Sequence, residues 1–155
     1  MTRVPFLIAG GFVALLPLTT IAADDAVVTS PNSLQWGPAP PALPKGAQMA
    51  VLFGDPTKEG PFVYRVKFPA GYQVAAHMHP TDENVTVISG SVHIGMGDKL
   101  DTSKGEELGT GGYLHMPKGM HHYAWTTEEA VIQNNGMGPA GITYINPADD
   151  PRKTN

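Results

Sequence analysis

The sequence has no cysteine among its 155 residues, and its ten lysine and arginine residues form no cluster. Without cysteine there are no disulfide bonds, no thiolate nucleophile and no cysteine-ligated zinc or iron–sulfur site. A net charge of −4 without a basic patch argues against nucleic acid as a partner. Convincing amphipathic helices and internal repeats are missing too, and the length suits one domain. With 18 glycines and 15 prolines, the composition indicates a turn-rich β-protein.

A long apolar run occurs only near the N-terminus. Arg3 precedes a mostly apolar stretch over residues 4–18, and the small residues Ala22 and Ala23 follow. This pattern predicts a signal peptide over residues 1–23, cleaved after Ala22 or Ala23. A membrane anchor is the alternative, but the run is shorter than the roughly 20 residues that span a bilayer. We therefore expect an exported protein, in a bacterial periplasm, with no membrane attachment after cleavage.

The remaining sequence predicts short strands separated by turns. In residues 62–68, aromatic and apolar side chains alternate with a face that carries Arg65 and Lys67, which is typical of a half-buried strand. Many such strands, punctuated by glycine and proline, favour a sandwich or barrel. Further strands are expected at residues 26–29, 48–53, 84–89, 91–96, 112–116, 120–126, 130–135 and 141–146, and a solvated loop at residues 97–111.

One stretch contains a histidine pair suited to metal binding. His77 and His79 are two residues apart, so on a strand they point to the same side, with Cα atoms about 6.5–7 Å apart. Two imidazoles at this spacing can converge on one ion. Residues 80–82 read as a turn that can bring Glu83 back as an oxygen ligand. A third histidine must come from elsewhere, and residues 111–125 hold the other histidine cluster of similar character.

Together the two stretches resemble the cupin superfamily, whose two motifs occur here in the expected order. The first motif is matched at every spacing by Gly71, His77, His79, Glu83 and Gly90. The second is matched by Gly111, Pro117, Gly119 and His122, with Thr126 in place of a terminal asparagine that is not a ligand.

The resemblance implies an all-β fold, a cupin-type double-stranded β-helix or jelly-roll barrel, over residues 47–146. A proline-rich N-terminal arm over residues 24–46 would lie along the barrel or reach a partner subunit, and residues 147–155 form a polar tail. Cupins of this size often form dimers, so a homodimer is a candidate assembly.

The resemblance also implies a metal site with His77, His79, Glu83 and His122 as ligands. His121 competes with His122, but adjacent strand residues face opposite sides and the motif spacing favours His122. This ligand set suits one divalent transition metal ion, Mn, Fe, Co, Ni, Cu or Zn, and disfavours Ca or Mg. Three neutral imidazoles and one carboxylate leave a net charge near +1, which attracts an anion or an enolate-like oxygen.

Strand parity predicts the lining of a compact, mostly apolar pocket. Residues on the faces of the expected ligands are Gln73, Ala75, Val85, Val87 and Ala124. No separate acid or base stands out, so Glu83 is the candidate catalytic base, unless it acts as a ligand alone. His93 and His115 are candidates for support of the site, although a structural role is the simpler interpretation.

The favoured function is that of a small exported metalloenzyme that oxidises a small organic substrate in a dioxygenase-like reaction. The resemblance also covers decarboxylases and isomerases. The alternative is a non-catalytic exported cupin that binds a small molecule or a metal ion.

Overall fold

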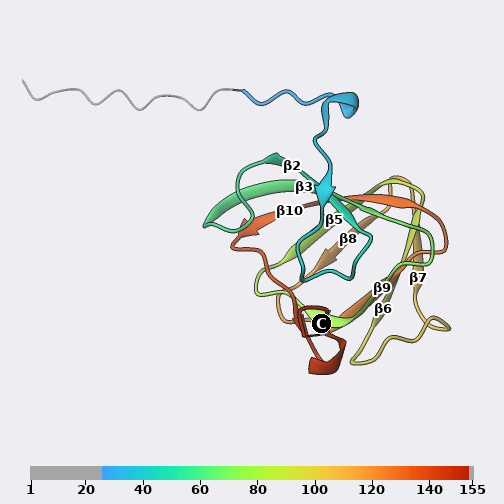
Figure 1. Cartoon of the computed structure of the whole chain (residues 1–155). Helices are drawn as coiled ribbons and strands as arrows, with labels where there is room; N and C mark the ends of the chain where they lie inside the picture. The colour runs from blue at the N-terminus through green and yellow to red at the C-terminus, as the bar shows by residue number, and fades with distance from the viewer. Residues whose placement is uncertain (1–25, 154–155) are drawn as a thin grey trace, which may run out of the picture.

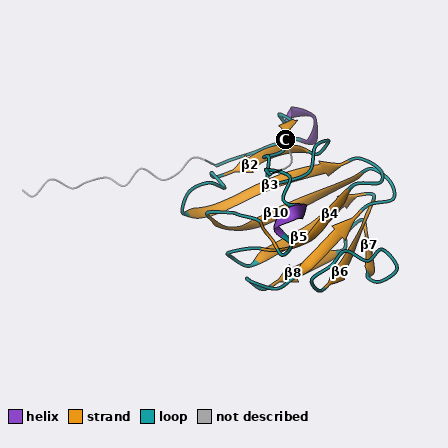
Figure 2. Cartoon of the chain, turned by 60° about the horizontal axis from the view of Figure 1, so that its bottom comes forward, coloured by secondary structure: helices purple, strands orange, loops and turns teal. Residues whose placement is uncertain are grey.

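The computed structural model describes residues 26–153, and the predicted signal peptide lies outside this range. Two antiparallel sheets pack face to face, and within the described range helical structure is limited to two short 3-10 turns (Figures 1 and 2). The first sheet has the order β1 (Gly37–Pro38), β2 (Gln48–Phe53), β3 (Gly60–Phe68), β10 (Ala130–Gly138), β5 (Glu83–Ser89) and β8 (Tyr113–Met116). The second has the order β11 (Thr143–Tyr144), β4 (Gln73–Met78), β9 (His122–Trp125), β6 (Ser91–Met96) and β7 (Glu106–Gly109). This arrangement confirms the predicted all-β fold.

The main core lies between the sheets. On β3, alternation directs Phe62, Tyr64, Val66 and Phe68 inward, as predicted. Valines of β4, β5 and β6 pack against them from other strands. A smaller cluster of Ala76, Tyr123 and Trp125 covers the other side of the second sheet.

Two strand predictions differ from the structure. Residues 26–29 form no strand, while β7 lies inside the stretch expected to be a loop. β7 is a charged edge strand, and charged side chains are a normal feature of edges because they oppose pairing with other chains. A hydrophobic pattern therefore could not reveal it.

The turn after β5 explains the second glycine of the first motif. Gly90 has a φ of +70°, and a Cβ atom there would lie 2.3 Å from the Glu129 carbonyl oxygen. Only glycine fits without moving the backbone. Thr126, which replaces the expected asparagine, donates a hydrogen bond to the Pro69 carbonyl (2.8 Å) and accepts one from the Tyr72 amide (3.2 Å). It thus ties the end of β9 to the turn before β4.

The later part of the N-terminal arm and the C-terminal segment pack on the barrel. Residues 39–46 cross the open side between the sheets (Figure 1), and the structure places this part of the arm on its own barrel. At the other end, a 3-10 turn over Pro147–Asp149 leads to buried Asp150, which pairs with Arg152. Within residues 26–153, no helix has the length and hydropathy to cross a membrane.

Candidate metal centre

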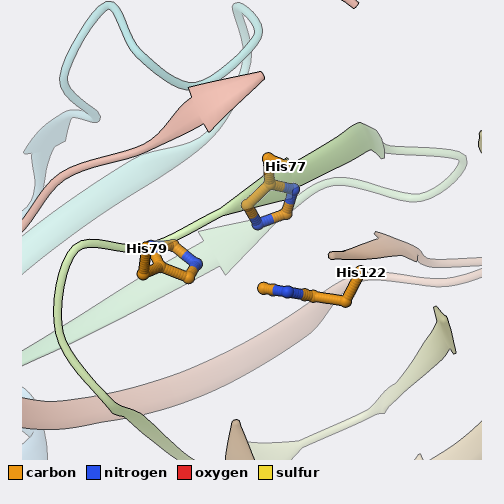
Figure 3. Close-up of side chains that lie close together, drawn as sticks. All are labelled: His77, His79 and His122. Atoms are coloured by element: carbon orange, nitrogen blue, oxygen red, sulfur yellow. The ribbon is translucent and has the colours of Figure 1, made fainter. Parts of the chain in front are cut away.

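Three imidazoles from two strands converge at one end of the space between the sheets. His77 lies in β4, His79 directly follows that strand, and His122 begins β9 (Figure 3). One ring nitrogen from each lies within 4.8 Å of the others. In the described part of the chain, they make the one cluster of this kind that could hold a metal ion.

Backbone carbonyl groups fix how the three rings present their nitrogens. The contacts are His77 Nδ1 to Ala75 O (2.7 Å), His79 Nδ1 to Gly141 O (2.7 Å) and His122 Nδ1 to Met120 O (3.1 Å). A carbonyl oxygen only accepts, so each neutral ring carries its proton on Nδ1. Each Nε2 therefore presents a lone pair, the form in which imidazole binds a metal.

Glu83 brings a carboxylate from the opposite sheet. It is the first residue of β5, and its Oε2 lies 3.3 Å from His79 Nε2 and 3.4 Å from His122 Nε2. Its Oε1 accepts a hydrogen bond of 2.6 Å from Asn134 Nδ2 on β10. The four predicted ligands are thus brought together, with Asn134 orienting the carboxylate.

The arrangement fits a metal ion. His79 Nε2 is buried and has no hydrogen-bond partner among the described residues. Because Nδ1 carries the proton, lone pairs of His79 and His122 face a carboxylate oxygen with no hydrogen between them. Lone pairs that face each other in a buried site repel, and a cation among them removes the repulsion.

The electrostatics of the site favour a neutral His77 near an ionised Glu83. Burial, and then the neighbouring His122 and His79, lower the pKa of His77 to about 3. Burial alone would raise the pKa of Glu83, but its contacts with His122 and His79 outweigh burial and hold that pKa well below its usual value. Burial also opposes a charge on His79, yet Glu83 raises the pKa of this ring overall.

The four donors open onto a cavity of about 240 Å³ between the sheets. Its walls are mainly apolar, with aliphatic residues of both sheets and Phe68. Among the described lining residues, Glu83 is the one acidic side chain, and lysine and arginine are absent. Such walls exclude water and leave the polar groups to orient a ligand.

The proline-rich arm forms part of this cavity wall. Pro40, Ala42 and Leu43 are among the lining residues. Two tyrosine hydroxyl groups hold the arm in place: Tyr144 donates to the Ala42 carbonyl (2.8 Å), and Tyr72 donates to the Pro44 carbonyl. The arm therefore contributes to the shape of the site.

Three of the five predicted pocket residues line the cavity and two do not. Val85, Val87 and Ala124 line the cavity, whereas Gln73 and Ala75 do not. Gln73 is exposed and lies beside a surface depression near Tyr123.

A register shift between β4 and β9 explains why Gln73 is not in the cavity. Three steps along β4, from Val74 to His77, face two steps along β9, from Ala124 to His122. The extra residue reverses the strand's parity, so Val74 lines the cavity in place of Gln73.

The other three histidines lie outside the cavity lining. His121 Nδ1 pairs with Asp98 Oδ1 at 2.6 Å, and His115 Nδ1 contacts Asn84 Oδ1 at 3.0 Å. The His93 ring stacks on Trp125, with ring centroids 4.9 Å apart. None of the three therefore supports the metal ligands directly.

Sequence reasoning missed Asn134 and Tyr64. Asn134 is 4% exposed and follows Ala130 and Ile132 on the inward face of β10, so the available signal was an amide at an apolar position. Tyr64 belongs to the predicted inner face of β3, but the sequence gives it no role at the site. Burial, and then the charge of Glu83, raise its pKa, so the phenol is protonated at neutral pH.

One protein-family model matches most of the chain. The family model described as a domain of unknown function, DUF4437, matches residues 26–151. The chain belongs to the DUF4437 family. A comparison with curated proteins finds no significant match. The buried histidine cluster therefore lies within the DUF4437 domain.

Solved structures similar to this DUF4437 protein include cupins. A proposed acetylacetone dioxygenase from Methylibium petroleiphilum shares 17% identity, covers 84% of this chain and 88% of its own, and superposes with a TM-score of 0.64. The polyketide cyclase RemF from Streptomyces resistomycificus shares 15% identity over 80% and 88%, with a TM-score of 0.63. An RmlC-like cupin from Shewanella frigidimarina shares 13% over 73% and 91%, with a TM-score of 0.56. At these identities the likeness establishes the cupin fold.

Proposed function

We propose that this protein is a metal-dependent enzyme that acts on a small organic compound, with dioxygenase-like oxidation as the favoured reaction. The observation that carries the proposal is the partnerless, buried His79 Nε2, which faces the Glu83 carboxylate at the end of an apolar cavity. Similar folds in a proposed dioxygenase and in a cyclase support an enzymatic role.

In this proposal His77, His79, His122 and Glu83 hold one divalent transition metal ion, Mn, Fe, Co, Ni, Cu or Zn. When bound, this ion supplies Lewis acidity and, if redox-active, electron transfer with dioxygen. The backbone carbonyls hold the imidazole rings, Asn134 holds Glu83, and the apolar walls exclude water. Glu83 is also the one carboxylate available in the described lining to accept a substrate proton.

Elemental analysis and oxygen uptake test this proposal. We expect about one transition metal ion per chain in protein purified without chelators. Protein loaded with Mn, Fe, Ni or Cu should consume oxygen with a member of a panel of small enols, β-diketones and phenols. His77→Ala should abolish uptake, while the matched His115→Ala, outside the cavity, should retain it. Equal turnover by metal-free protein would contradict the proposal, and zinc as the sole native metal would disfavour oxygen chemistry.

One observation favours a non-catalytic binding cupin as the second candidate. Asn134 holds Glu83 Oε1 by a hydrogen bond of 2.6 Å, which keeps the carboxylate directed at the histidines as a ligand and restricts its movement as a base. Protein that carries a stoichiometric ligand but turns over no compound of the panel would support this candidate.

We also propose that the protein acts outside the cytoplasm, in a bacterial periplasm, because of the signal peptide predicted at residues 1–23. Cell fractionation with N-terminal sequencing should find a mature chain that begins at Ala23 or Asp24. A full-length cytoplasmic chain would contradict this location. The homodimer is likewise a proposal, to be tested by light scattering.

A further inference from the structure

Tyr64 differs from the other four tyrosines of the chain. The hydroxyl groups of Tyr72, Tyr113, Tyr123 and Tyr144 all donate hydrogen bonds to protein oxygens. The Tyr64 hydroxyl has no such partner among the described residues, although its ring lines the cavity and stacks on Phe62 with centroids 5.3 Å apart. Among the described residues, the Tyr64 hydroxyl is also not one of the fully buried polar atoms without a partner, so it stays accessible and free to bond a molecule in the cavity.

Strand register places this phenol close to the candidate metal centre. Tyr64 on β3 is directly opposite Asn134 on β10, and Asn134 is opposite Val85 on β5. Residues opposite each other in a sheet have Cβ atoms about 4.5–5.5 Å apart. Asn134 in turn donates its hydrogen bond to Glu83. Tyr64 is thus next to the amide that orients the carboxylate.

The cavity limits what such a hydroxyl can bind. Its volume of about 240 Å³ suits a compact molecule. The described lining has no lysine or arginine to neutralise a polyanion, and few donors or acceptors to satisfy a sugar. A compact, mostly apolar molecule with few oxygens fits this lining.

We propose that Tyr64 is a substrate-binding residue whose hydroxyl donates a hydrogen bond to an oxygen of a compact, mostly apolar ligand that carries at most one negative charge. That ligand occupies the cavity beside Glu83 and the three histidines, and small phenols and enolised ketones belong to its class. The inference rests on the proposed function, since it takes the cavity as the substrate site.

Phenol and toluene form a matched probe pair, because a hydroxyl in one replaces a methyl in the other. Their dissociation constants are measured by NMR titration for the wild type, Tyr64→Phe and Tyr113→Phe, each in zinc-loaded and in metal-free form. Tyr113→Phe is the control, since this exposed tyrosine bonds Asn84 away from the cavity. Thermal unfolding of all three proteins is recorded in parallel.

We expect Tyr64→Phe to raise the Kd for phenol roughly tenfold, a factor within the range of one hydrogen bond. The Kd for toluene should stay unchanged, as should both constants in Tyr113→Phe. The melting temperature of Tyr64→Phe should stay close to that of the wild type, since the variant loses no hydrogen bond within the protein.

Three results would overturn the inference: an unchanged phenol constant in Tyr64→Phe, an equal loss for both probes, or no binding of either probe to the wild type. A protein that binds no metal but still shows the phenol-specific loss would refute the proposed metal function and support the role of Tyr64. A protein that binds metal but shows an unchanged Kd for phenol in Tyr64→Phe would refute the role of Tyr64 and support the proposed metal function.

Discussion

The six histidines divide into two groups of three, inside and outside the barrel. In the inner group, Nδ1 of His77, His79 and His122 contacts backbone carbonyls, and one ring nitrogen of each lies within 4.8 Å of the others. Nε2 of His79 and of His122 also faces Glu83. The outer group interacts with other side chains: an aspartate, an asparagine and a tryptophan ring. Residue type alone therefore does not make a metal ligand. A ring becomes a candidate when the backbone fixes its tautomer and its free lone pair meets others in a buried space.

Adjacent residues His122 and His121 give the sharpest test of this comparison and the largest expected effect. Metal at about 100 times its Kd should stabilise the wild type by about 2.7 kcal/mol, seen as a rise in melting temperature. His122→Gln should lose most of this rise, because one donor is removed, while His121→Gln should keep it. Thermal unfolding with and without Mn²⁺ or Zn²⁺ measures both. An equal response of the two variants would break the distinction between the groups.

Two asparagines extend the comparison to supporting residues. Asn134 orients Glu83 inside the cavity, whereas Asn84 contacts His115 and Tyr113 outside. Asn134→Ala should weaken metal affinity about 10–100-fold, the usual effect of losing a group that orients a ligand. Asn84→Ala should leave affinity unchanged. Competition with a chelating dye measures both constants, and a similar affinity for the two variants would contradict the assignment.

Acid should destabilise the metal-free protein through the inner group. The pKa of His77 is about 3 when folded, against about 6.5 when unfolded, so below pH 6.5 the unfolded chain binds the extra proton. Stability should therefore fall as pH drops from 6.5 toward 3, by at most about 1.4 kcal/mol per unit from this ring. Glu83, whose pKa is lowered, acts in the same direction below its unfolded value, whereas His79, whose pKa is raised, acts against it.

Urea unfolding at several pH values checks this expectation. His77→Gln cannot titrate at that position, so its stability should fall less steeply with pH than that of the wild type. Equal slopes for the two proteins would mean that His77 is not held neutral by the fold.

The smallest effect is expected in the outer group. His93→Ala removes the stacking on Trp125 and should lower stability by about 0.5–1.5 kcal/mol. His121→Ala removes an exposed pair with Asp98 and should change stability by at most about 1 kcal/mol. Neither change should alter metal affinity, and a loss of affinity in either variant would move that residue to the inner group.

Much of this architecture could be predicted from the sequence because its signals are local. Alternation revealed β3, and two spaced motifs selected four donors that the structure brings together. The inner face of β4 could not be predicted, because one extra residue between Val74 and His77 reverses its parity. Asn134 lies on β10 and Tyr64 on β3, and the pairing of β10 with β3 and with β5 depends on contacts between distant parts of the chain. The three carbonyl acceptors leave no mark in the sequence, since every residue has one.

The carbonyl acceptors have a consequence for evolution and engineering. Truncating a side chain cannot delete a main-chain oxygen. The orientation of the three imidazole rings is therefore insensitive to most point mutations at the residues that supply these oxygens. Asn134 is the exception, because the amide that orients the Glu83 carboxylate belongs to a side chain. Among these orienting contacts, the one on β10 is therefore the one that a point mutation can change while the ligands themselves are kept.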